Sequence, residues 1–89
     1  MITQALRDEL SNILQDGDYR VALDILRGQQ IPCNLSALSH FITGNRPYHL
    51  RGQDFFNALA EAVRRRRAKE QAANQTARET LRELTAAPA

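Results

Sequence analysis

The sequence predicts an all-α fold: a small domain of four or five helices with a long or additional helix at its C-terminus. Ala, Leu, Gln, Arg and Glu outnumber Val and Ile, which favours helix over sheet. Apolar residues recur at the helical period in four segments. With 89 residues the chain can bury one small core, and its three Pro and four Gly are too few for a low-complexity disordered chain.

The first helix is expected over residues 2–15, where five apolar residues follow the helical period: Ile2, Leu6, Leu10, Ile13 and Leu14. Gly17 should end this helix, and Asp18 should cap the next one. The second helix is short and has one apolar side: Tyr19, Val21, Ala22, Ile25 and Leu26. Gly28 should close it. Residues 29–33 then form a connector, because Pro32 keeps the residue before it out of the helical region.

The third helix is expected to begin after Asn34, a good N-cap, and to end at Gly44 before Pro47. Its buried stripe consists of Leu35, Leu38, Phe41 and Ile42. The opposite face carries small neutral residues: Ser36, Ala37, Ser39, His40 and Thr43. A solvated helix normally carries Lys and Glu on this face, so the pattern indicates a helix that lies against another molecule.

The fourth helix should begin near Gly52, with Asp54 in its first turn and one strongly apolar face: Phe55, Phe56, Leu59, Ala60 and Val63. After Val63 the sequence turns polar, and a thin apolar stripe returns only at Ala73, Ala77, Leu81 and Leu84. Two arrangements fit this pattern, either one long helix whose middle stands in solvent or a core helix followed by a separate C-terminal helix. We therefore divide the chain into a helical domain, residues 1–63, and a basic helical extension, residues 64–89, predicted to dimerise.

The predicted core combines the apolar faces of these helices: Leu6, Leu10, Ile13, Leu14, Val21, Ile25, Leu26, Leu38, Phe41, Phe56, Leu59 and Val63. The net charge is only +2, but the cations are concentrated. Residues 31–69 hold seven Arg and Lys against two acidic residues, whereas the segments before and after are slightly acidic. This asymmetry points to a polyanionic partner, and first of all to nucleic acid.

Other classes of protein lack support in the sequence. No apolar run approaches the ~20 residues of a membrane span, and the N-terminus lacks the features of a signal peptide, so we expect a soluble cytoplasmic protein without a membrane partner. The single cysteine, Cys33, excludes an internal disulfide and should pack as a small apolar group. There is no phosphate-binding loop, metal-ligand spacing or paired nucleophile and base. We therefore expect no enzyme, no cofactor and no metal site.

A hydrophobic–Ser–x–hydrophobic segment, followed by Gly and a basic residue, is formed by Leu38, Ser39, Phe41, Gly44 and Arg46. With the apolar residues 55–63 in the place of the next core helix, this pattern resembles the helix-turn-helix of the phage repressor/Cro class over residues 19–63. The connector is longer than the tight turn of that family, and Pro32 stands in place of its usual glycine.

The resemblance implies a DNA-binding transcriptional regulator from a phage or mobile element, acting as a homodimer on double-stranded DNA. The helix over residues 34–43 would enter the major groove, with six candidate base-reading residues: Asn34, Ser36, Ala37, Ser39, His40 and Thr43. The turn after it would contact phosphates through Asn45, Arg46, Tyr48, His49 and Arg51.

Four consecutive arginines, Arg64, Arg65, Arg66 and Arg67, are further candidates for phosphate contacts. They span about 400° around a helix, so they cannot all face one groove. They could also form a solvated face supported by the pairs Glu61–Arg65 and Arg66–Glu70, or bind RNA. The alternative function belongs to another class: a small inhibitor or adaptor whose cations meet an acidic protein surface, or which covers the nucleic-acid site of its partner.

Overall fold

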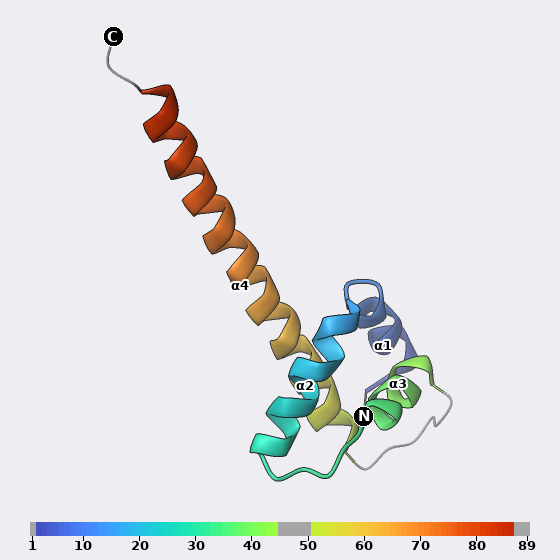
Figure 1. The fold of residues 1–89 in the computed structure, drawn as a ribbon. Coiled ribbons are helices and arrows are strands. Elements are labelled where there is room, and N and C mark those ends of the chain that lie inside the picture. The colour runs from blue at the N-terminus through green and yellow to red at the C-terminus, as the bar shows by residue number, and fades with distance from the viewer. Residues whose placement is uncertain (1, 45–50, 87–89) are drawn as a thin grey trace.

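The structure is a computed structural model that describes residues 2–44 and 51–86. Over this part of the chain it contains four helices and no strand: α1 (Gln4–Ser11), α2 (Asp16–Gly28), α3 (Leu35–Thr43) and α4 (Gly52–Thr85). Helices α1, α2 and α3 gather around the first turns of α4, and the rest of α4 projects from this domain (Figure 1). The molecule is therefore elongated, with extents of 65 × 27 × 18 Å. The predicted all-α fold is confirmed.

Helix α1 is shorter than the predicted range of residues 2–15. The Thr3 hydroxyl caps it by accepting from the backbone N–H of Leu6 at 3.2 Å. It ends at Ser11, because the N–H groups of Ile13 and Leu14 both donate to the carbonyl of Leu10 and turn the chain. The helical period continued past the point where the backbone leaves the helix.

The start of α2 corrects two predictions. Gly17 does not end the first helix, and Asp18 is not the N-cap; both lie in the first turn of α2, and Gln15 is the N-cap. The Asp18 carboxylate reaches back and accepts from the backbone N–H of Gln15 at 2.9 Å, which is half of a capping box. The sequence motif marked the correct place, but its residues stand inside the helix. As predicted, α2 closes at Gly28.

Helix α3 has the predicted ends. The Asn34 side-chain oxygen accepts from the backbone N–H of Ala37 at 2.7 Å, and Gly44 takes a left-handed conformation with φ of 78° at the C-cap. Leu38, Phe41 and Ile42 are buried, as the stripe predicted. Leu35 is the exception, since it is 39% exposed at the edge of the domain.

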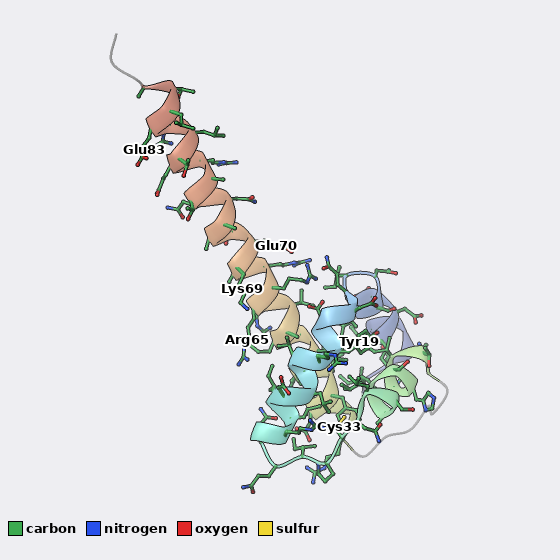
Figure 2. All side chains as sticks on the ribbon, viewed as in Figure 1. Tyr19, Cys33, Arg65, Lys69, Glu70 and Glu83 are labelled. Carbon is green, nitrogen blue, oxygen red and sulfur yellow. The ribbon has the colours of Figure 1, made fainter. Side chains whose placement is uncertain are left out.

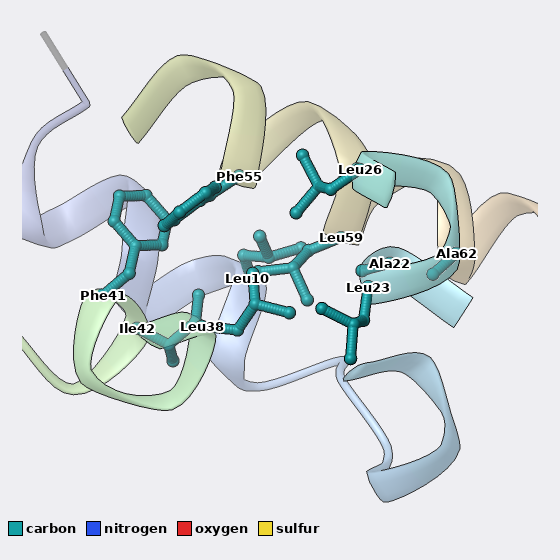
Figure 3. Packing of buried hydrophobic residues seen from close by; sticks show 11 residues of the cluster. Leu10, Ala22, Leu23, Leu26, Leu38, Phe41, Ile42, Phe55, Leu59 and Ala62 are labelled. Carbon is teal, nitrogen blue, oxygen red and sulfur yellow. The ribbon is translucent and has the colours of Figure 1, made fainter. Parts of the chain in front are cut away.

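The core lies where α2, α3 and the first turns of α4 meet (Figure 3). The rings of Phe41 and Phe55 pack edge to face, with centroids 5.8 Å apart. Of the predicted core residues, six are buried: Leu10, Leu26, Leu38, Phe41, Leu59 and Val63. Four are half-buried: Leu14, Val21, Ile25 and Phe56. Leu6 and Ile13 were wrongly placed in the core, since they are 42% and 41% exposed on or just after the short α1.

Helix α4 is one continuous helix of 34 residues, so the first of the two arrangements left open by the sequence is the observed one. Its buried residues lie between Gly52 and Val63. Beyond Val63 only Arg66 is partly buried among the described residues, and the boundary predicted at residue 63 falls inside the helix. None of the helices described is long and apolar enough to cross a membrane.

Candidate nucleic-acid interface

The outer face of α3 is exposed, as its composition predicted. Asn34, Ser36, Ser39, His40 and Thr43 are all exposed. Ala37 differs from the other five candidates, because it is half-buried and packs against the core. The face carries no Lys, Arg, Asp or Glu. Five of the six predicted base-reading residues therefore lie on one accessible surface.

The polar groups of this surface differ in how far they are already occupied. The side-chain oxygen of Asn34 accepts the capping bond, and the Thr43 hydroxyl donates to the carbonyl of His40 at 3.3 Å. The side chains of Ser36, Ser39 and His40 form no hydrogen bond to any residue that the structure describes. These three side chains can donate to or accept from a ligand without breaking an internal contact.

A shallow groove runs beside α3, where its first turns face the start of α2. Its lining consists of Asp16, Tyr19, Arg20, Leu35 and Ser39. Burial, together with the carboxylates of Asp16 and Asp18, raises the pKa of Tyr19. The phenol therefore stays protonated at neutral pH and is a potential hydrogen-bond donor. No sequence motif marked this groove, because its residues come from two helices.

Of the residues predicted to contact phosphates after α3, four lie outside the described residues: Asn45, Arg46, Tyr48 and His49. Arg51 is described and exposed at the start of α4. Its guanidinium forms an ion pair with Asp54 at 3.5 Å, one turn further on. Both side chains are largely solvated, so this ion pair contributes little to stability and leaves the guanidinium accessible.

The four arginines after Val63 point in different directions. Arg64 and Arg65 both pair with Glu61, at 2.8 and 3.4 Å, and these two guanidinium groups lower the pKa of Glu61. Arg67 is exposed. The pair Arg66–Glu70 is present at 3.4 Å, as is Glu61–Arg65. The solvated-face interpretation of this segment thus has both of its predicted ion pairs.

Arg66 has a different position from its neighbours. Its guanidinium Nε lies 3.1 and 3.2 Å from the two carboxylate oxygens of the buried Asp18, and its Nη2 donates to the carbonyl of Ile13 at 2.8 Å. The hydrogen bond from Asp18 is the main cause of the raised pKa of Arg66. Arg66 fastens α4 to the turn between α1 and α2, so its donors are already engaged by protein. We leave it out of the proposed phosphate contacts.

The arginine segment and the outer face of α3 are not brought together. Helix α3 meets α4 at its first turn, where Phe41 lies against Gly52 and Phe55. Arg64 follows twelve residues after Gly52, which is about 18 Å along the helix. Figure 2 shows Arg65 and Lys69 on the side of α4 away from α3. One ligand surface of small size cannot include both groups.

The remaining chemistry-bearing groups form no site in the described part of the chain. Cys33 is half-buried, and burial raises the pKa of its thiol, which is consistent with the predicted packing role. No group of three or more His, Cys, Asp or Glu could hold a metal among the residues described.

Comparison of the chain with protein-family models, with characterised proteins and with solved structures finds no match.

Proposed function

We propose that the protein is a sequence-specific DNA-binding transcriptional regulator of a phage or mobile element, which reads the major groove with α3. The observation that carries this proposal is the outer face of α3, where Ser36, Ser39 and His40 are exposed and bond to no described residue. Hydroxyl and imidazole groups can donate to or accept from base edges. A helix of nine residues with a neutral polar face is small enough to enter the groove.

The opposite side of α3 supports the same role. Leu38, Phe41 and Ile42 fix the helix in the core, and Asn34 and Gly44 define its two ends. A reading helix must be held within a fraction of an ångström, because base contacts depend on direction as well as distance. Ala37, being half-buried, contributes at most a methyl contact at the edge of the surface.

Positioning on the duplex would come from cations around α3. Arg51 is the described candidate, and Asn45, Arg46, Tyr48 and His49 remain predictions. Arg64, Arg65 and Arg67 would reach phosphates at a distance from α3 along α4, so they extend the footprint rather than add to the reading surface. Such contacts set affinity and salt dependence but carry no sequence information.

A salt-titrated binding assay tests this proposal. The protein should bind random duplex DNA at low salt and lose affinity steeply as salt is raised, because bound cations release counterions from the phosphates. Arg51→Ala should lower the salt slope by roughly one unit if Arg51 contacts a phosphate. Ser11→Ala, an exposed serine on α1, serves as the control and should change nothing.

A second candidate function has one observation in its favour. The groove beside α3 combines the exposed Leu35 with Tyr19 and with charges of both signs, Asp16 and Arg20. Such a surface fits a protein partner, as expected of a small inhibitor or adaptor. Absence of DNA binding even at low salt would reject the first proposal and favour this one.

A further inference from the structure

The end of α4 is a helix without a partner. From Arg67 to Ala86, which we call the α4 extension, every described residue is exposed. Leu81 and Leu84 are 59% and 69% exposed, the highest values among the large apolar residues described as exposed. A helix of about 20 residues has only marginal stability in water when it stands alone. Its apolar residues therefore call for a covering surface.

The apolar stripe of the extension continues the buried face of α4. Five helical turns take about 18 residues, so residues separated by 18 stand one above the other. Ala73 therefore stands over Phe55, Ala77 over Leu59, and Leu81 over Val63, and those three lower residues are buried in the core. The stripe lies on the side of α4 that carries the domain, beyond the point where α2 ends its contact.

The charges flanking the stripe change sign along the helix. Residues 64–69 hold four Arg and one Lys with no acidic residue, whereas Glu79 and Glu83 lie near the far end. Lys69 and Glu83 are separated by 14 residues, about four turns, so they flank the stripe on the same side. A helix with this pattern is complementary to a copy of itself that runs in the opposite direction.

We propose that a second copy of this chain covers the stripe, with its α4 antiparallel to the first and the two-fold axis near Thr76. In this arrangement Lys69 of each copy faces Glu83 of the other, and the stripes meet over about 18 residues, or roughly 27 Å. An isologous contact of this kind is closed, so it yields a dimer and no larger assembly.

A parallel pair would meet two obstacles. Helix α2 lies against α4 along its first turns and occupies the space that the partner's α4 would need beside residues 52–63. A parallel pair would also place the two arginine segments side by side, where like charges repel. In the antiparallel pair, the partner's helix ends near Arg67, where α2 begins, so both obstacles are absent.

The proposed dimer also accounts for an exposed residue in the domain. Ile13 is 41% exposed, and its carbonyl is held by Arg66, which stands at the base of the extension. Leu84 stands 18 residues, five turns, above Arg66. In the antiparallel pair, Leu84 of the second copy descends to the level of Ile13, and each apolar side chain supplies cover for the other.

Distances between spin labels test the direction of the pair. In a Cys33→Ser background, single labels are placed at Thr76→Cys or at Ala86→Cys in the full chain. We expect a short label-to-label distance for Thr76→Cys, set by the spacing of two packed helices, and an axial separation of roughly 30 Å for Ala86→Cys. Short distances at both positions would show a parallel pair, and the absence of any distance at 100 micromolar protein would show a monomer; either result overturns the proposal.

Substitutions test the contacts, with light scattering as the measurement. Leu81→Ser with Leu84→Ser should weaken dimerisation at least about tenfold, because each change acts twice in a symmetric interface. Lys69→Glu should weaken it, and adding Glu83→Lys should restore it. Glu79→Gln, on the same helix but farther from the stripe, should have a smaller effect than Lys69→Glu. A dimer that is unaffected by the leucine substitutions refutes the interface. The inference is independent of DNA binding, so either can fail without the other.

Discussion

Replacing Phe41 by alanine should be the most damaging single change in the domain. Phe41 is 2% exposed, and its ring packs edge to face on Phe55 and beneath the guanidinium of Arg7, which lies 5.5 Å from the ring centroid. Removing a buried ring of this kind costs about 3–5 kcal/mol through lost transfer free energy and the cavity that remains. The loss of the aromatic pair falls within that range at its upper end.

The size of this loss can be compared with the whole stability. At roughly 0.05–0.15 kcal/mol per residue, a chain of this length has a free energy of unfolding of about 4–13 kcal/mol. Phe41→Ala would thus remove a large part of it. Urea denaturation followed by circular dichroism at 222 nm measures the change. Phe56→Ala is the matched control, because Phe56 is only half-buried on the same helix as Phe55. A loss below about 1 kcal/mol, or one equal to that of Phe56→Ala, would refute this account of the core.

Three further predictions concern single residues. Asp18→Ala should destabilise the domain by at least about 1 kcal/mol from the lost cap of α2, and Asp18→Asn, which keeps a capping oxygen, should lose less in urea denaturation. Gly44→Ala should cost about 1–2 kcal/mol in thermal unfolding, because φ at this position is 78° and an added Cβ would meet the side chain of Gln4; an unchanged midpoint would contradict the assigned C-cap. Cys33 should react with iodoacetamide at pH 7.5 more slowly than a cysteine in an unfolded peptide, because its raised pKa leaves less thiolate; an equal rate would contradict the burial.

The features that the sequence predicted well are those set by neighbouring residues. Asn34 and Gly44 define α3 because an N-cap and a left-handed C-cap act within one turn of the chain. The exposed face of α3 followed from the same local pattern. Ile13 and Leu35 were misplaced, since periodicity gives the apolar side of a helix but not how far the neighbouring helix covers it.

Contacts between distant parts of the chain could not be predicted in this way. Asp18 and Arg66 are 48 residues apart, and only the packing of α2 on α4 brings their side chains together. For the same reason four consecutive arginines looked equivalent in sequence, whereas Arg66 alone is held by the turn between α1 and α2. The groove beside α3 likewise depends on the approach of two helices.

The central claim is that α3 reads bases, and it is tested most directly by separating specific from random binding. Duplexes enriched from a random library would supply the specific site, and the binding of His40→Ala and Ser39→Ala would then be measured on that site and on random DNA. We expect each variant to lose about 1–3 kcal/mol on the specific site for a lost base contact, with binding to random DNA almost unchanged. Equal losses on both DNAs, or a library in which no sequence is enriched, would contradict the assignment of α3 as the reading helix.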